Sequence, residues 1–221
     1  MMFKEALSWY KGVTPSNVRV GQLESVVGAI EDFPFDSVCC IETGASQNWD
    51  DGCVGAFFAQ LCQLTNGEFY SVDNNAEVVE KSKELYENLN IPVNHYLGDS
   101  VTYLKSTGVV PNLVHLDSWD LDLKNPFPSA LHGWREFMAI EDKMPVGSII
   151  VVDDNFFKGT WVTWNYTDGR ESERIDINYP IVGKGSNIWH FIESGESNWE
   201  KLSQDTPGPN VKLVYQKVKS S

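Results

Sequence analysis

The chain has 221 residues, of which 42% are apolar and 22% are charged, so it holds enough apolar material for a sizeable core. This composition excludes intrinsic disorder, a collagen-like fibre and a small disulfide scaffold. Asp and Glu number 31 against 17 Lys and Arg, which gives a formal net charge of −14. Nucleic acids and anionic membranes are disfavoured as partners, because proteins bind their phosphate groups with clustered cations.

Two features bear on the cell compartment. The first residues lack a charged region followed by a long apolar run, and no stretch elsewhere reaches the roughly 18 apolar residues that span a bilayer. The four cysteines (Cys39, Cys40, Cys53 and Cys62) form no Cys-x-x-Cys pair, so we expect buried free thiols rather than a disulfide framework or a zinc site. The sequence therefore predicts a soluble, cytoplasmic protein.

The chain begins with two segments of helical spacing and continues with short apolar runs. Apolar positions in residues 3–11 and 16–31 recur with the helical period, which predicts two leading helices. Five short runs after Ser37 have the continuous apolar character of strands buried on both faces of a parallel sheet. These runs are residues 38–41, 68–72, 93–97, 113–116 and 148–152.

The segments between the runs have helical periodicity, and they cover residues 53–65, 75–89, 100–107 and 128–143. Alternating strands and helices predict an α/β, Rossmann-like doubly wound fold, with a mostly parallel sheet of about seven strands and helices on both faces. A further helix is expected near 186–203, and the alternating run 211–218 predicts an antiparallel edge strand. With no repeat or linker, residues 1–221 are expected to form a single domain.

Acidic and polar residues follow each of the five apolar runs. In a doubly wound sheet, ligands bind outside the carboxyl ends of the strands, which is where these residues fall. A helix cap or a turn explains any one of them, but five consecutive cases favour a ligand site. The five groups are Glu42-Thr43-Gly44-Ala45-Ser46, Asp73-Asn74-Asn75, Gly98-Asp99-Ser100, Asp117-Ser118-Trp119-Asp120 and Asp153-Asp154-Asn155.

The first three groups indicate a nucleoside. Asp73 stands where an acidic side chain receives the two hydroxyls of a ribose, and Asp99 stands where the amino group of adenine is met. Gly44 lets the backbone pass close to a ligand. The strict Gly-x-Gly-x-x-Gly pattern is missing, which counts against NAD and against a phosphate-binding loop.

Taken in order, the motifs resemble a known family. The set is Glu-x-Gly-x-Ser, Ser-Val-Asp, Gly-Asp-Ser, Leu-Asp-Ser-Trp-Asp and Gly-Ser-Ile-Ile-Val-Val-Asp-Asp-Asn. It resembles the class I S-adenosylmethionine-dependent methyltransferases over about residues 37–157. More narrowly, it is similar to the metal-dependent O-methyltransferases, namely catechol O-methyltransferase and the macrocin-type sugar O-methyltransferases.

The resemblance implies roles for individual residues. Those implied to bind S-adenosylmethionine are Glu42, Gly44, Ala45 and Ser46 at the methionine part, Asp73 with Asn74 at the ribose, and Asp99 with Ser100 at the adenine. The implied Mg²⁺ ligands are Asp117, Asp154 and Asn155, a set of hard oxygen donors. The sugar-directed relatives favour the Asp-Asp pair, so Asp153 is the alternative to Asn155.

The resemblance also implies an in-line displacement, in which a hydroxyl on the cation loses its proton and its oxygen attacks the sulfonium methyl. In the catechol enzyme a Lys three residues after the first metal-binding Asp takes the proton. Asp120 stands at that position here, and it could accept the proton or join the metal ligands, so the base is left open between Asp120, Lys124, His132 and Lys158. The catalytic residues are expected to be Asp120 and, as a ligand of the cation, Asp117. His115 lies inside a strand and is expected in the core.

Several aromatic residues follow the fourth and fifth runs, where the methyl acceptor is expected. Aromatic side chains there pack in the core or stack on a sugar or an aromatic ring. They are Trp119, Phe127, Trp134, Phe156, Phe157, Trp161, Trp164 and Tyr166. The segment 158–184 that carries the last of them is expected to be a lid or a subunit contact.

The sequence therefore predicts an S-adenosylmethionine-dependent methyltransferase that uses Mg²⁺ to O-methylate a small hydroxylated molecule such as a sugar, a phenol or a natural product. No nucleic-acid or membrane partner is expected, and a homo-oligomer is left open. The alternatives are a metal-independent methyltransferase of the same fold, a non-catalytic adenosine-nucleoside binding protein and, more weakly, an NAD-dependent reductase. Added Mg²⁺ should change the activity or the melting temperature only if the carboxylates converge on a metal, and NAD should compete only if the protein is the reductase.

Overall fold

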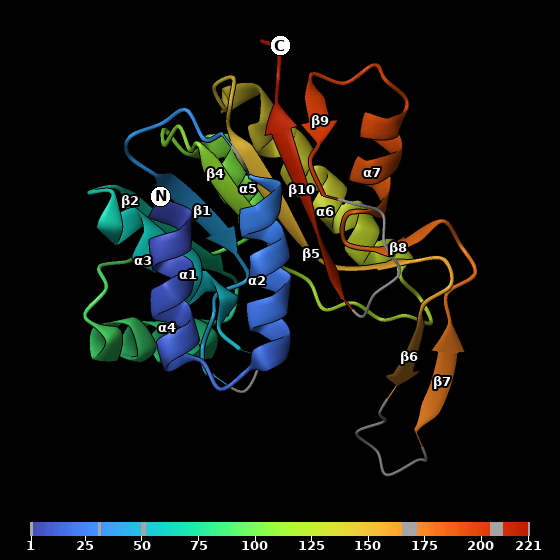
Figure 1. Cartoon of the computed structure of the whole chain (residues 1–221), viewed down its shortest axis with the longest axis horizontal. Helices are drawn as coiled ribbons and strands as arrows, with labels where there is room; N and C mark the ends of the chain where they lie inside the picture. The colour runs from blue at the N-terminus through green and yellow to red at the C-terminus, as the bar shows by residue number, and fades with distance from the viewer. Residues whose placement is uncertain (1, 31, 50–51, 165–171, 204–209, 221) are drawn as a thin grey trace.

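The computed structural model describes residues 2–30, 32–49, 52–164, 172–203 and 210–220. Its main sheet has the strand order β3-β2-β1-β4-β5-β10-β9, and β8 pairs with the far end of β5 (Figure 1). The strands of this sheet are β1 (Cys39–Thr43), β2 (Glu68–Asp73), β3 (Asn94–Leu97), β4 (Leu113–Leu116), β5 (Ile149–Phe157), β8 (Ile181–Gly183), β9 (Trp199–Lys201) and β10 (Val211–Lys217). The strands from β3 to β5 are parallel, which brings their carboxyl ends to one edge.

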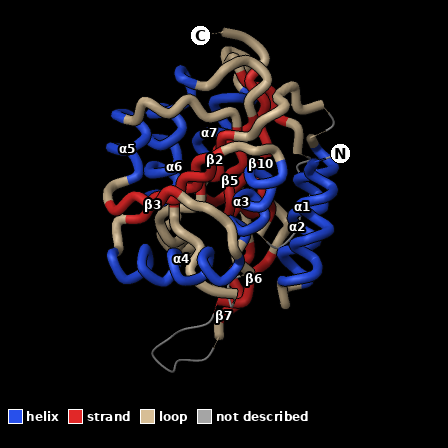
Figure 2. Tube along the Cα trace, turned by 90° about the vertical axis from the view of Figure 1, so that its left-hand side faces the viewer, coloured by secondary structure: helices blue, strands red, loops and turns tan. Residues whose placement is uncertain are grey.

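Helices cover both faces of the sheet, and the sheet runs between them in Figure 2. They are α1 (Met2–Val13), α2 (Asn17–Ala29), α3 (Val54–Leu64), α4 (Ala76–Leu89), α5 (Ser100–Ser106), α6 (Phe127–Ile140), the 3₁₀ turn η1 (Glu141–Lys143) and α7 (Ser186–Glu193). Successive strand residues point to opposite faces, so Ile149 packs with α1 to α4 whereas Ile150 packs with α5 to α7. Continuous apolar runs are the consequence of this burial on both sides.

The predicted α/β architecture is confirmed, and two details near the carboxyl end of the chain differ. β10 is antiparallel to β5 as expected, but the short β9 lies outside it and forms the edge. The helix predicted over 186–203 ends at Glu193, so its second half was wrong. Gly195 adopts a φ of +78° just after the helix, and Trp199 packs in the core as part of β9. Burying the large indole removes much apolar surface from water, which favours the strand over a longer helix.

The segment expected to be a lid contains a separate two-stranded hairpin. Its strands are β6 (Trp161–Trp164) and β7 (Glu173–Asp176), and the hairpin projects from the body of the molecule in Figures 1 and 2. Residues 165–171, including Tyr166, lie outside the described residues, as do Asp50 and Asp51. No helix among the described residues is long and apolar enough to cross a membrane.

The cysteines agree with the prediction of free thiols. Cys40, Cys53 and Cys62 are buried and Cys39 is half-buried, and all four are unbridged. His115 is likewise buried in β4, where its ring packs against Phe58 with centroids 4.8 Å apart. His115, Cys40 and Cys62 are therefore core residues, whereas Cys53 also lines the cleft described below.

Candidate functional site

A cavity of about 800 Å³ opens at the carboxyl ends of the parallel strands. This volume lies within the range of small-molecule sites, and its position is the one that doubly wound sheets use for ligands. Its lining includes Arg19, Gly44, Ala45, Ser46, Val72, Asp73, Asn74, Gly98, Asp99, Ser100, Asp117, Trp119, Asp120, Leu121, Leu123, His132, Asp154, Phe156, Val162 and Lys184. The residues that follow β1 to β5 therefore meet in one cleft.

The turn after β1 is held close to the ends of β2 and β4. Gly44 adopts a φ of +82°, and a Cβ atom there would lie 2.6 Å from the carbonyl oxygen of Asp117, so a larger residue would push the two strand ends apart. The Ala45 amide donates to Asp73 Oδ2 at 3.0 Å, and the Asn75 amide donates to Asp73 Oδ1 at 2.8 Å. Each carboxylate oxygen accepts more than one hydrogen bond, so Asp73 retains capacity for ribose hydroxyls.

Glu42 lies behind this turn rather than in the cleft. Its carboxylate is fully buried and accepts from the hydroxyls of Ser46 and Ser71, each at 3.2 Å. The Ser46 hydroxyl in turn accepts from the Gly55 amide at 3.1 Å. The structure thus places Gly44, Ala45 and Ser46 at the cleft, with Glu42 as the buried support of their turn.

The groups after β3 are joined to α6 by side-chain contacts. Asp99 caps α5, and its hydrogen bonds with the Thr102 hydroxyl and amide lower the pKa of its carboxyl. Ser100 Oγ lies 3.1 Å from His132 Nε2. The His132 ring faces Trp119, whose centroid is 5.1 Å away and whose side chain is 55% exposed. The Trp119 indole therefore lies where the groups after β3 meet those after β4.

The structure brings Asp117 and Asp154 together around Lys184, which belongs to none of the sequence motifs. Lys184 Nζ lies 2.6 Å from Asp117 Oδ1 and 2.8 Å from Asp154 Oδ2. Burial by itself lowers the pKa of the Lys184 ammonium, but the two carboxylates raise it, and the net direction is upward. The ammonium is therefore charged and occupies the space between the two acids.

Asn155 is not brought to the other two implied metal ligands. Its amide nitrogen donates to the carbonyl oxygens of Val152 and Asp153, at 3.0 and 2.9 Å, and its amide oxygen accepts from the Gly185 amide at 2.8 Å. The side chain is wholly buried and bonded to backbone, so it has no free oxygen facing the cleft. The three predicted metal ligands therefore do not converge: Asp117 and Asp154 lie together, and Asn155 faces the backbone.

The alternative ligand Asp153 is also engaged by cations of the chain. Lys212 contacts its carboxylate, and Arg19 Nη1 lies 3.5 Å from Asp153 Oδ2. Burial acts to raise the pKa of Asp153, but Lys212 and then Arg19 lower it, and the net direction is downward. One ligand atom each of His115, Asp117 and Asp153 lies within 4.8 Å of the others, yet the Asp153 oxygen is already paired. This donor set does not fit Mg²⁺, which prefers free carboxylate oxygens and water.

The proton-acceptor candidates differ in their position. Burial raises the pKa of the Asp117 carboxyl to about 7, against the opposing effect of Lys184. Asp120 is exposed at the cleft, and His132 also lines it. Lys124 pairs with Glu173 at 2.6 Å, and Lys158 is exposed on the turn after β5; neither of them lines the cleft.

Two residues at the cleft have backbone conformations that L-residues rarely adopt. Asp154 has a φ of +54° within β5, and Trp119 has a φ of +64° after β4. Such strain persists where the surrounding structure enforces it, and it clusters at functional sites. Trp119 follows the end of β4, and Asp154 lies in β5 just beyond the stretch that pairs with β4.

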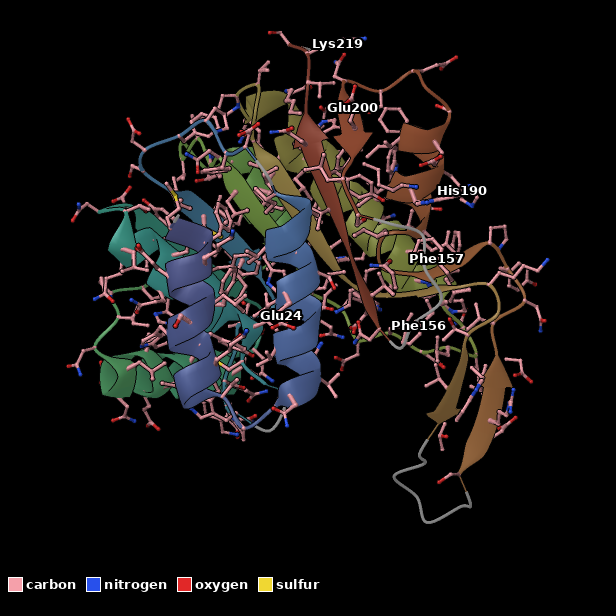
Figure 3. All side chains as sticks on the ribbon, in the orientation of Figure 1. Glu24, Phe156, Phe157, His190, Glu200 and Lys219 are labelled. Carbon is pink, nitrogen blue, oxygen red and sulfur yellow. The ribbon has the colours of Figure 1, made fainter. Side chains whose placement is uncertain are left out.

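Of the aromatic residues expected near the acceptor, Trp119 and Phe156 line the cleft. Phe156 lies at the end of β5 above the base of the hairpin (Figure 3) and packs with Leu123 and Val182. Trp134 and Phe157 instead contact core aromatics on α6 and α7. The acceptor side of the cleft therefore has one apolar wall.

No family model and no curated protein matches the chain. Solved structures do match: an S-adenosylmethionine-dependent methyltransferase from Clostridium acetobutylicum is 11% identical, with 89% of each chain covered and a TM-score of 0.52. An rRNA methylase from Streptococcus thermophilus is 11% identical, covering 90% of this chain and 97% of that chain, with a TM-score of 0.55. NSun6 from Pyrococcus horikoshii with SFG is 15% identical, covering 89% and 51%, with a TM-score of 0.56. The chain therefore has the Rossmann-like α/β fold of these methyltransferases.

Proposed function

We propose that this protein is an S-adenosylmethionine-dependent methyltransferase that methylates a hydroxyl of a small molecule without a divalent metal. The supporting observation is a single cleft with two chemically different halves. Asp73 and Asp99 border one half, and Asp117 and Asp120 border the other together with an exposed indole. Two neighbouring subsites are what the transfer of a group from a bound cofactor to an acceptor requires.

The cofactor half is assigned from hydrogen-bonding capacity. The Asp73 carboxylate is held by two backbone amides and keeps lone pairs for two ribose hydroxyls. Ser100 and the Asp99 backbone stand beside it at the start of α5, where an adenine ring would be met. The turn at Gly44 to Ser46 then runs beside the methionine part, toward Asp117.

The acceptor half is assigned from its apolar wall and its carboxylates. Leu123, Phe156 and Val162 supply apolar surface, and Trp119 supplies a flat ring that can stack on an acceptor ring. Asp117 and Asp120 lie on the loop that begins at the end of β4, within the same half. A ring that carries hydroxyl groups can stack on the indole and the apolar wall, and its hydroxyl groups can donate hydrogen bonds to the carboxylates.

The chemistry is an in-line displacement. An O–C bond forms between the acceptor oxygen and the methyl carbon while the S–C bond breaks, and its electron pair turns the sulfonium into a neutral thioether. The hydroxyl proton passes to the Asp117 carboxylate, because a base with a pKa of about 7 accepts a proton near neutral pH. Asp120 accepts a hydrogen bond from a second acceptor hydroxyl and so orients the ring.

A small acceptor is favoured over a nucleic acid by charge. The formal net charge is −14, and the lining of the cleft has five Asp residues (Asp73, Asp99, Asp117, Asp120 and Asp154) against the cations Arg19 and Lys184. Both of these cations are already close to carboxylates of the chain. A polyanion would therefore meet repulsion at the site, whereas a neutral or cationic molecule would not.

Cofactor binding is tested by calorimetric titration with S-adenosylmethionine and S-adenosylhomocysteine. We expect both to bind, and Asp73→Asn to weaken the affinity about tenfold or more, because a charged acceptor of two hydroxyl groups is lost. Asp36→Asn is the matched control, since Asp36 is exposed and does not line the cleft. Absence of binding in the wild type would overturn the proposal.

The acceptor is identified by transfer of a labelled methyl group to panels of phenols, sugars and RNA. Incorporation into a hydroxylated small molecule, lost in Asp117→Asn, is the expected result. Incorporation into RNA alone would contradict the small-molecule assignment. Cofactor binding without transfer to any panel member would favour the non-catalytic nucleoside-binding alternative.

A further inference from the structure

Lys184 is the centre of a buried arrangement that the proposed methyl transfer does not use directly. Its side chain is only 4% exposed, although an ammonium is costly to bury. Nζ has three acceptors: Asp117 Oδ1 at 2.6 Å, the Asp117 carbonyl oxygen at 2.9 Å and Asp154 Oδ2 at 2.8 Å. Three acceptors match the three hydrogens of an ammonium group, so its donors are all engaged.

The backbone on both sides of Lys184 packs closely against β5, which directs the lysine side chain toward Asp117 and Asp154. Gly183 pairs with Asn155 at the end of β8, and a Cβ atom on Gly183 would lie 2.0 Å from the Asp154 carbonyl oxygen. Only glycine allows this close approach at its φ of +137°. On the other side, the Gly185 amide donates to the Asn155 amide oxygen. The segment 183–185 is thus fixed on both sides of the lysine.

Asn155 therefore has an assignable role as a positioning residue. Its amide group joins three backbone segments: its own strand through Val152 and Asp153, β10 through the Val211 carbonyl at 3.3 Å, and the lysine segment through Gly185. Through its hydrogen bond with Gly185, the Asn155 side chain fixes the position of the backbone next to Lys184. It does not add an oxygen ligand to the cleft.

The ammonium and a metal ion compete for one position. Mg²⁺ bound to both carboxylates would lie about 2.0–2.1 Å from their oxygens, which would place it almost in contact with Nζ. We propose that Lys184 is a resident cation that takes the place of a divalent metal between Asp117 and Asp154, and that Asn155 holds it there. Removing the ammonium should then turn the same two carboxylates into a divalent-cation site.

The inference goes beyond the proposed function and is tested without a methyl acceptor. Mn²⁺ is titrated into the wild type and into Lys184→Ala, with bound metal followed by electron paramagnetic resonance. We expect no saturable binding at the site in the wild type and a single new site in Lys184→Ala, at least about tenfold tighter than any wild-type site. Adding Asp154→Asn to Lys184→Ala should abolish the new site.

Lys158→Ala is the matched control. Lys158 is an exposed lysine directly after β5 that does not line the cleft, so its removal should leave Mn²⁺ binding unchanged. If Lys184→Ala does not fold, Lys184→Met keeps the apolar stem and removes only the charge. Saturable Mn²⁺ binding by the wild type that disappears in Asp154→Asn would overturn the proposal, as would folded Lys184→Ala and Lys184→Met proteins that gain no site. Titration of S-adenosylmethionine in the same samples shows separately whether the proposed function fails.

Discussion

The two halves of the cleft are built in different ways. In the cofactor half, the two carboxylates are held by backbone amides of the turns beside them: Asp73 accepts from Asn75 and from Ala45, and Asp99 caps the helix that it precedes. In the acceptor half, Asp117 is held by a lysine 67 residues away. The first half depends on local turns, and the second depends on β8 folding back over the end of β5.

This difference predicts where the protein is most sensitive to substitution. A local turn reforms around a changed side chain, because its backbone hydrogen bonds remain. A buried ion pair between distant segments leaves an uncompensated charge when one member is removed. The acceptor half should therefore lose stability when its cation is removed, whereas the cofactor half should mainly lose affinity.

The largest effect is expected for Lys184→Ala. Removing the ammonium leaves Asp117 and Asp154 facing each other, and we expect a loss of about 3 kcal/mol in the free energy of unfolding. Urea denaturation measures this loss, with Lys158→Ala as a control that should stay within about 0.5 kcal/mol of the wild type. A loss below about 1 kcal/mol for Lys184→Ala would show that the two carboxylates are well solvated.

Gly183→Ala changes the backbone next to Lys184 and leaves the ammonium in place. The added Cβ meets the Asp154 carbonyl oxygen, whereas Gly159, also at positive φ, has nothing within 4 Å of its Cβ position. Gly159→Ala should therefore report backbone strain alone, at about 1 kcal/mol. We expect Gly183→Ala to cost about 2 kcal/mol more by denaturation, and equal costs would contradict the close approach.

The pH dependence of methyl transfer tests the acceptor half through Asp117. Its pKa is raised from 3.8 to about 7 by burial, so the carboxylate form needed as a base accumulates as the pH rises through 7. The rate kcat/KM should fall about tenfold for each pH unit below 7 and level off above it. Asp117→Asn should remove this inflection, and an unchanged inflection would assign the base elsewhere.

The smallest effect is expected from a chelator. If Lys184 supplies the positive charge at the acceptor half, then EDTA should change neither the affinity for S-adenosylmethionine nor the rate of transfer. The comparison is made by calorimetry and by label incorporation before and after dialysis. If EDTA abolished activity and Mg²⁺ restored it, the metal-dependent mechanism would be supported instead.

The order of apolar and acidic residues along the chain is enough to predict the architecture and one half of the cleft. Apolar runs such as 149–152 must be strands buried on both faces, and the acidic residues that end them must gather at one edge because the strands are parallel. Asp73 and Asp99 could be placed in this way, since Asp73 ends β2 and Asp99 lies two residues beyond the end of β3. The short β9 was missed because Trp199 lies in a run of three strand residues with no local pattern.

The pairing of charges at the other half depends on contacts between segments that are far apart in the chain. The pattern Asp-Asp-Asn within β5 resembles a metal-ligand set, but periodicity carries no information on which cation lies opposite. Lys184 stands in a Gly-Lys-Gly segment far along the chain, and its ammonium reaches Asp117 and Asp154 because β8 pairs back onto β5. Asn155 is turned toward Gly185 for the same reason, since a buried amide must satisfy its hydrogen bonds with whatever backbone the fold brings beside it.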